Sequence, residues 1–328
     1  MTLAGYAARR LIAAVPTLIG ITLITFLLLE ILPGREAALA GPEGGSFLTG
    51  EAVARIRATY HLDEPAWRRY LEWLLRLCRW DLGDSILDGR PVSQVIQEAA
   101  VPTLVLNVVA LAMAFCVSVP VGVGWARRRR AGRGGAGSLV SYLLYAFPNF
   151  AAALLLQQFF SVGLGLLPLQ GTNDLPPGSP FWATARDLAA HLILPAVCLS
   201  YGSLAYLARF TRTNLLEVLT REHLLAARGR GIGETVLAWR HALRNALIPL
   251  ITLLGLLVPA LLGGSVLIET VFSWPGLGRL YFYSLQNRDF PVVLGLTTLT
   301  AILTLAGALL ADLLCAIADP RFAEEVTR

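Results

Sequence analysis

The sequence predicts an all-α polytopic membrane protein with about six transmembrane helices. Of its 328 residues, 55% are hydrophobic and 15% are charged, and the mean hydropathy is +0.62. These values lie above the apolar share and below the charged share of ordinary soluble domains. Six uncharged runs each reach the ~18 to 20 residues that a helix needs to cross the hydrocarbon core of a bilayer. They cover residues 11–29, 99–126, 134–173, 188–208, 245–268 and 290–311.

Arginine placement predicts the orientation of these runs. Arginines are frequent before the first run, between the second and third runs, and between the fourth and fifth runs. The loop after the third run holds only one arginine, and the loop after the fifth run holds only two. Short cytoplasmic loops carry an excess of basic residues. We therefore expect six spans with both termini in the cytoplasm. The arginines assigned to that side are Arg9, Arg10, Arg127, Arg128, Arg129, Arg130, Arg133, Arg209, Arg212, Arg221, Arg228, Arg230, Arg240 and Arg244.

The basic residues also limit the chemistry, because all 27 of them are arginines and none is a lysine. A nucleotide-binding phosphate loop of the Walker type requires a lysine, and so does Schiff-base catalysis. The chain is therefore expected to bind no ATP of its own. Any use of nucleotide would have to come from another polypeptide.

Three regions follow from the runs. Residues 1–32 hold the N-terminus and the first span, which is too long for a signal-peptide core and lacks a small-residue cleavage site. Residues 33–98 form an extracytoplasmic segment with eight arginines against ten acidic residues. Such a long segment escapes the charge rule. Residues 99–328 form the core, with spans 2 to 6 and a charged loop over 209–245.

Within the extracytoplasmic segment, two stretches have helix-compatible patterning, residues 51–60 and 64–80. In the second stretch, Trp67, Tyr70 and Trp73 fall near helical spacing. An aromatic stripe of this kind predicts a small core or an interfacial anchor rather than a ligand site.

The charged loop is the most informative part of the chain. It predicts a short helix from about Glu222 to Arg228, a glycine break, and a second helix that starts at Glu234 and continues into span 5. Two short helices joined by a glycine elbow are suited to docking against a cytoplasmic partner. An amphipathic helix among anionic lipid headgroups would use the same arginines, and the pattern alone leaves both interpretations open.

The loop resembles the coupling motif of membrane-spanning permease subunits in ATP-binding-cassette importers for dipeptides and oligopeptides, whose relatives import nickel. Ala226, Ala227 and Gly231 match its Ala-Ala and Gly positions, and residues 241–249 read His-Ala-Leu-Arg-Asn-Ala-Leu-Ile-Pro. The likeness extends over essentially the whole chain. Further matching segments are residues 9–11, 17–22, 32–34, 81–85, 89–92, 269–280, 288–293 and 319–321.

The resemblance implies roles for two groups of residues. The first would couple the chain to an ATPase. Its motif starts at Leu225 where the family often has Glu or Arg, and two extra glycines imply a shorter or looser helix. The coupling residues are Glu222, Leu225, Ala226, Ala227, Arg228, Arg230, Gly231 and Gly233. The second group would serve gating or docking at the outer face, and consists of Glu269, Phe272, Trp274, Pro275 and Gly276.

The resemblance also implies the partners. A second permease chain would complete the path, two cytoplasmic ATPase subunits would bind ATP and Mg²⁺, and an extracytoplasmic binding protein would deliver a peptide. Residues 33–98 and 269–289 would offer the docking surface for that protein. The expected location is the bacterial plasma (inner) membrane. This chain itself would bind no cofactor and have no catalytic residue.

The sequence also bears on three alternative functions. The first is the same machine carrying nickel or a metal chelate. The second is an intramembrane protease, but no nucleophile elbow follows Ser265, and the His-Glu-x-x-His pattern is missing from the sequence. The third is proton-coupled transport, which needs acidic groups near the midplane of the bilayer. Glu30, Glu269 and Asp312 lie near span ends instead. The spacing of His61, His191, His223 and His241 predicts no metal site.

Overall fold

The computed structural model describes residues 3–31, 64–130, 145–176, 178–247, 249–250 and 265–318. Within these ranges every regular element is helical, and the only pairing of extended chain is an isolated bridge between Asp84 and Pro91. This confirms the all-α class. The chain divides into two compact units, which are described separately: residues 1–103, 262–266 and 276–328 form unit 1, and residues 104–261 with 267–275 form unit 2.

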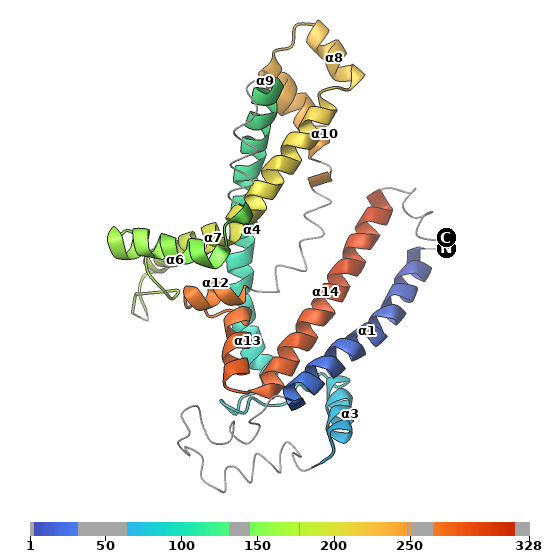
Figure 1. The fold of residues 1–328 in the computed structure, drawn as a ribbon, viewed down its shortest axis with the longest axis vertical. Helices are drawn as coiled ribbons and strands as arrows, with labels where there is room; N and C mark the ends of the chain where they lie inside the picture. The colour runs from blue at the N-terminus through green and yellow to red at the C-terminus, as the bar shows by residue number, and fades with distance from the viewer. Residues whose placement is uncertain are drawn as a thin grey trace. The chain divides into compact units, whose positions relative to one another are not determined.

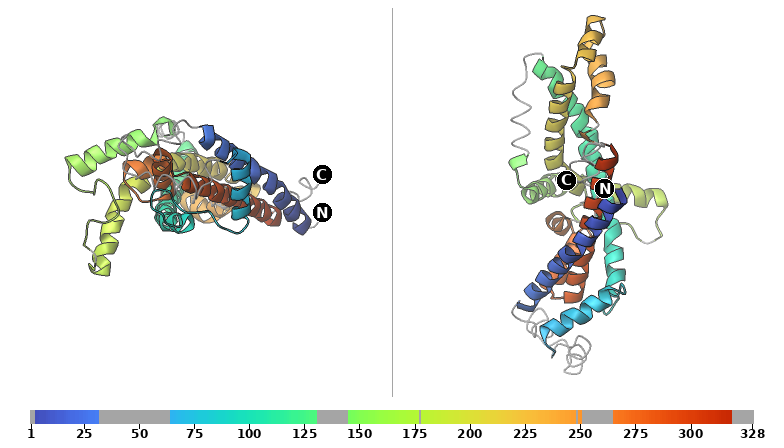
Figure 2. Two further views of the ribbon diagram at one scale, coloured as in Figure 1. Left: turned by 90° about the horizontal axis from the view of Figure 1, so that it is seen from below. Right: turned by 90° about the vertical axis from the view of Figure 1, so that its right-hand side faces the viewer.

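Unit 1 is built on helices α1 (Leu3–Ile31) and α14 (Phe290–Ala318), which lie side by side in both views (Figures 1 and 2). It also contains α3 (Ala66–Leu77), α13 (Leu277–Gln286) and the first part of α4 (Val92–Arg130). The apolar runs explain α1 and α14, since a helix satisfies its own backbone hydrogen bonds within lipid.

Helix α3 lies within the predicted 64–80 stretch and is anchored on α1. The Tyr70 hydroxyl lies 3.0 Å from the Thr22 hydroxyl and donates to the Ile19 carbonyl at 3.1 Å. Arg69 pairs with Glu30 at 2.5 Å. Tyr70 packs with Phe26 and Leu29, and Trp73 packs against them, as the predicted small core requires, but Trp67 of the same stripe is 66% exposed. Glu30 is stabilised at the end of its span by Arg69.

Unit 2 contains the rest of α4, then α6 (Asn149–Leu156), the π-helix η1 (Gln157–Gly163) and the long α7 (Phe181–Val218). Four short helices and α12 (Val266–Val271), nearly all of which belongs to this unit, complete the described part. Helices α4 and α7 pack closely at Gly122, where an added Cβ would lie 2.7 Å from the Ala208 carbonyl oxygen. A glycine is needed there because the backbones approach each other directly.

Three helix starts share one cause. Pro65, Pro148 and Pro180 occupy the position before α3, α6 and α7, with φ of −57°, −64° and −55° and extended ψ. Proline fixes φ near these values and has no N–H group to satisfy. It therefore sets the entry of the chain into each helix.

Four described helices are long and apolar enough to cross a membrane: Ala7–Ile31, Val92–Arg129, Phe181–Val218 and Phe290–Leu310. They match the first, second, fourth and sixth predicted runs. Outside the described residues lie 134–144 of the third run, 248 and 251–264 of the fifth run, and the predicted 51–60 helix. The count of six spans therefore stays a prediction. The described part of the third run forms α6 and η1 up to Gly163, and an irregular loop follows.

Two boundaries differ from the sequence analysis. Helix α4 begins at Val92, before the start of the predicted second run at residue 99, so the last residues of the predicted 33–98 segment are helical. Most of the predicted outer loop over 269–289 is also helical, as α12 and α13. The reason is packing: Leu277 of α13 is buried against Val92, Ile96, Val292 and Leu296, which favours a helix over an open loop.

Candidate functional site

The predicted coupling motif forms two helical stretches at the C-terminal end of α7 (Figures 1 and 2). Helix α8 covers Glu222–Gly229, which confirms the first predicted helix. The second begins at Glu234 and runs through α9 (Glu234–Val236), η2 (Leu237–Ala242) and α10 (Leu243–Ala246). We call residues 222–246 the coupling segment.

One face of the coupling segment is buried in its own unit. Leu224 is buried, and Ala227 and Ile232 pack against the same apolar cluster. The cluster joins α4, α7, α8 and the second stretch. Burying apolar surface in this way fixes α8 to the ends of two long helices. Its buried members are Val123, Ala126, Leu215, Val218, Leu219, Leu224, Leu237, Ala238, Ala242, Leu243 and Ala246.

The opposite face of α8 is open. Leu225 is 48% exposed although its neighbour Leu224 is 2% exposed. A single exposed leucine is ordinary on a protein surface, but this one lies among further motif residues that are exposed as well. The exposed motif residues are Glu222, Leu225, Ala226, Arg230, Gly231 and Gly233, whereas Ala227 and Arg228 are half-buried.

The elbow between the two stretches depends on one glycine. Gly231 has φ of +82°, the left-handed region in which glycine is favoured. Its N–H donates to the Arg228 carbonyl at 2.9 Å, which closes the end of α8. Gly229 is the last residue of α8 and Gly233 is the cap of α9 with φ of −61°. Helix α8 therefore runs through Gly229, and Gly231 alone of these glycines needs its special backbone freedom.

An ion pair braces the elbow. The Arg228 guanidinium donates to both carboxylate oxygens of Glu234, at 2.5 and 3.3 Å. Arg127 of α4 donates to the Thr235 hydroxyl at 2.8 Å. Arg228 is thus engaged within the chain, whereas Arg230 is exposed and is the better placed of the two predicted arginines to contact another protein.

The second predicted group occupies a different environment. We call residues 269–276 the ETVFSWPG segment. Glu269, Phe272 and Trp274 are only 1%, 2% and 1% exposed. Gly276 is also buried, and Pro275 alone of the five is exposed.

The buried aromatic side chains of this segment fill two clusters of unit 2. Phe272 packs with Ala153, Leu194, Cys198 and Ile268. Trp274 packs with Leu106, Ala110, Leu192 and Ala196. These contacts assign the two rings to the interior of the protein.

The backbone of the segment is tied to the irregular loop over 164–180. The Gly171 N–H donates to the Phe272 carbonyl at 2.9 Å. The amide of Gln157 in η1 donates to the carbonyls of Leu169, at 2.8 Å, and of Val271, at 3.2 Å. The loop and the segment therefore form one hydrogen-bonded structure within unit 2.

Two further motif segments meet in unit 1 although they are about two hundred residues apart. The Ser85 hydroxyl donates to one carboxylate oxygen of Asp289, and the Ile86 N–H donates to the other at 3.1 Å. Asp289 is 2% exposed. Burial raises the pKa of its carboxyl above the usual value, and the hydrogen bonds from Ser85 and Ile86 partly oppose that shift.

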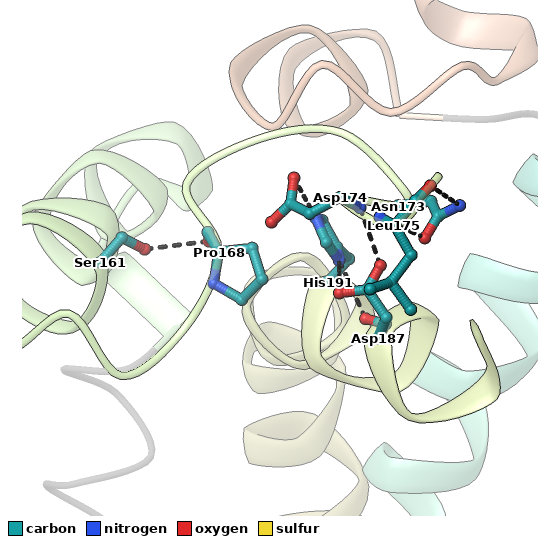
Figure 3. Close-up of polar contacts among 7 residues, drawn as sticks. All are labelled: Ser161, Pro168, Asn173, Asp174, Leu175, Asp187 and His191. Carbon is teal, nitrogen blue, oxygen red and sulfur yellow. Dashed lines mark hydrogen bonds and ion pairs between the residues drawn. The ribbon is translucent and has the colours of Figure 1, made fainter. Parts of the chain in front are cut away.

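The sequence analysis missed one side-chain group. Asp174, Asp187 and His191 lie together, with one candidate metal-binding atom from each within 4.8 Å of the others (Figure 3). The spacing of four residues between Asp187 and His191 on one helix was a usable signal. The histidines alone were compared for spacing, and the loop residue Asp174 could not be placed from the sequence.

Comparisons with known proteins agree with the motifs. Residues 118–324 match the family described as binding-protein-dependent transport system inner membrane component, and residues 3–107 match the N-terminal part of such components. The oligopeptide transport system permease protein AppB of Bacillus subtilis is 37% identical over 97% of this chain and 99% of its own length.

Two further relatives are similar over comparable lengths. The dipeptide transport system permease protein DppB of Escherichia coli K12 is 36% identical over 96% of this chain and 98% of its own. The glutathione transport system permease protein GsiC of Salmonella typhi is 34% identical over the same shares. All three are named as transport permeases, which favours a transport subunit over the protease alternative. The chain belongs to the binding-protein-dependent transport system inner membrane components, the multi-pass permease subunits of ATP-binding-cassette importers.

Proposed function

We propose that this chain forms the translocation path of a peptide importer together with a second permease subunit. Two cytoplasmic ATPase subunits bind ATP and Mg²⁺ and supply the energy, and an extracytoplasmic binding protein delivers the peptide. Support for the substrate comes from the relatives, which are named for oligopeptide, dipeptide and glutathione transport. The lack of lysine in the chain agrees with nucleotide chemistry in separate subunits.

The observation that carries this proposal is the two-sided construction of α8. Its buried face belongs to the apolar cluster with the ends of α4 and α7, and its other face exposes Leu225, Ala226 and Arg230. In our proposal, the exposed face occupies a groove on an ATPase subunit. Closure of the ATPases moves α8, and the cluster passes this movement to α4 and α7 as a rigid-body change.

Orientation follows from the same assignment. The coupling segment faces the cytoplasm, as do both termini, and the loop over 164–180 faces outward with the binding protein. Arginine placement supports this arrangement. Reporter fusions at Arg328 and after Gly171 test it: activity of a cytoplasmic reporter at the first site and of a periplasmic reporter at the second is expected. The reverse pattern would overturn the orientation.

The substrate is tested through the binding protein and through uptake. The binding protein encoded beside this chain is purified without refolding, and its retained ligand is identified by mass spectrometry. A peptide is expected. The full transporter, reconstituted in proteoliposomes, should then take up that peptide only when ATP is present on the side of the membrane where the ATPase subunits lie. A nickel chelate in the binding protein and ATP-driven nickel uptake would overturn the peptide assignment in favour of the metal importer.

A further inference from the structure

We infer that Asp174, Asp187 and His191 form a binding site for one divalent transition-metal cation of the Zn²⁺ type. Asp187 and His191 lie on the first turns of α7, and Asp174 lies on the loop before it. Figure 3 shows the two carboxylates on either side of the imidazole ring. The site is independent of the proposed peptide substrate, since it is argued from these three side chains alone.

The hydrogen bond of the His191 ring shows which of its two nitrogens is free to bind a cation. Nδ1 of His191 lies 2.9 Å from the backbone carbonyl oxygen of Asp187. A carbonyl oxygen only accepts hydrogen bonds, so Nδ1 carries the proton in this contact. In the neutral ring, Nε2 then holds a lone pair. Metal-binding histidines in proteins typically show this arrangement, in which the second nitrogen is oriented by a carbonyl or carboxylate.

Nε2 of His191 is buried and faces the carboxylate of Asp174. The His191 side chain is 1% exposed, and Nε2 has no hydrogen-bond partner among the described residues. Its nearest carboxylate oxygen, Oδ1 of Asp174, is 3.6 Å away, which is beyond hydrogen-bond distance. A buried lone pair that faces a carboxylate is unfavourable. A cation between the two groups removes that penalty because both become ligands.

The carboxylates complete the donor set. The Asp174 N–H donates to Oδ2 of Asp187 at 2.8 Å, which brings the loop to the helix. Ligand atoms around a tetrahedral zinc ion are about 3.4 Å apart, for bonds of about 2.1 Å. The candidate ligand atoms lie within 4.8 Å of one another. Oδ1 of Asp187 now lies 3.7 Å from Nδ1 of the ring, so coordination by all three residues through Nε2 requires the Asp187 carboxylate to turn towards Nε2 as well as a small closure. Asp174, whose side chain is 71% exposed, has room to make it.

The chemistry of the set selects the metal class. One imidazole with two carboxylates suits zinc, nickel or cobalt, whereas magnesium and calcium prefer oxygen ligands alone.

The location of the three residues is also accessible from outside the lipid. A helix of 38 residues such as α7 rises about 57 Å, far more than the ~30 Å hydrocarbon core. Its first turns can therefore extend beyond the lipid.

A bound cation would fasten the loop that supports the ETVFSWPG segment. The same loop donates to Phe272 through Gly171. Binding to the closed state alone lowers the population of the locally open state by the factor 1 + [metal]/Kd, about 100-fold at 100 times Kd. Amide exchange of the loop around Asp174 is expected to slow accordingly.

The test uses the full chain in detergent, purified through a tag without histidine and stripped with a chelator. Zn²⁺ is titrated against a fluorescent chelator, and Co²⁺ is followed by its visible absorption. We expect one equivalent of tightly bound metal, and at least tenfold weaker binding in His191→Gln and Asp174→Asn. Because Asp174 is exposed, its variant should fold normally. His241→Gln, which changes an exposed histidine elsewhere, is the matched control and should bind as the unaltered chain does.

Hydrogen exchange of residues 164–176 with and without Zn²⁺ provides the second measurement. Slower exchange with zinc in the unaltered chain, but not in Asp174→Asn, is expected. The inference is overturned if no stoichiometric metal binds, if His191→Gln binds equally well, or if magnesium and calcium compete at equal concentration. A protonated His191 held by the two carboxylates would give the first of these results.

Discussion

The two motif groups predicted from the sequence differ in where the protein places them. In the coupling segment, Leu225, Ala226 and Arg230 are exposed on a helix whose other face is packed. In the ETVFSWPG segment, Phe272 and Trp274 are buried in the clusters of unit 2. The first motif is therefore suited to another protein. The second contributes mainly to the packing of its own unit. In our proposal, the first motif contacts an ATPase subunit.

The two segments also differ in the interactions that hold them in place. The elbow of the coupling segment is held by the partly exposed Arg228–Glu234 ion pair, which contributes little free energy in water. The ETVFSWPG segment is held by buried side chains and by backbone hydrogen bonds. We therefore expect changes in the ETVFSWPG segment to act on stability, and changes in the coupling segment to act on transport.

The largest effect is expected for Trp274→Ala. Removing a fully buried indole leaves a cavity and costs about 3–5 kcal/mol of stability. The thermal midpoint of the purified transporter should fall by many degrees, as measured by size-exclusion fluorescence after heating. Pro275→Ala, at the exposed neighbouring position, is the control and should leave the midpoint nearly unchanged. Equal midpoints for the two variants would contradict the architectural role.

Asp289 provides the next test, since it is also a buried motif residue. Asp289→Ala leaves the Ser85 hydroxyl and the Ile86 N–H without their partner and should cost about 1–3 kcal/mol. Asp289→Asn keeps one acceptor oxygen for the Ile86 N–H, and the Ser85 hydroxyl can turn to accept from its NH2 group, so it should cost less than alanine. Thermal midpoints at neutral pH distinguish the two. If alanine and asparagine are equally harmful, the hydrogen bonds are not the cause.

The raised pKa of Asp289 gives this pair a pH dependence. In the window between the usual pKa and the raised one, the folded state binds more protons than the unfolded state. Stability from this group therefore increases as the pH falls through the raised pKa, and decreases as the pH rises. Because asparagine does not titrate, the unaltered chain should gain stability relative to Asp289→Asn between pH 7 and pH 4. A loss of stability relative to Asp289→Asn on acidification would contradict this sign.

A smaller free-energy effect is expected for Gly231→Ala, but with a clear effect on transport. Nothing lies within 4 Å of an added Cβ, so only the left-handed backbone is penalised, by about 1–2 kcal/mol. Uptake per ATP hydrolysed should fall while assembly is retained. Gly233→Ala also has open space, but its φ is ordinary, so it should keep normal coupling. Loss of coupling in both variants would show that the backbone argument is wrong.

The smallest effect on stability, under about 1 kcal/mol, is expected for charge reversal in the Arg228–Glu234 ion pair. Arg228→Glu should lower uptake, and the swap Arg228→Glu with Glu234→Arg should restore it, because the ion pair is rebuilt. Arg230→Glu should lower uptake without rescue by Glu234→Arg. Uptake and ATP hydrolysis are measured together in proteoliposomes. Rescue of both single variants, or of neither, would contradict the division of roles between the two arginines.

Sequence reasoning predicted four of the long apolar helices and the coupling helices, because both depend on local pattern. The described part of the third run forms only the shorter α6 and η1. The Gly231 elbow follows from glycine between two helix-compatible stretches. The burial of Trp274, the joining of Ser85 to Asp289 and the gathering of Asp174 with His191 were not predictable. Each depends on tertiary packing between distant segments, and packing also turned residues 277–286 into a helix. The coupling roles themselves remain proposals.

The most direct test of the coupling role is cysteine cross-linking in the assembled transporter. The native cysteines are replaced, since Cys78 and Cys116 are exposed, and single cysteines are placed at Ala226 and, as a control, at Pro275. A short bifunctional reagent should join Ala226→Cys to an ATPase subunit, in a yield that changes when ATP is bound, and should not join Pro275→Cys to it. Failure of Ala226→Cys to cross-link, or an equal yield from Pro275→Cys, would contradict the assignment of α8 as the contact with the ATPase.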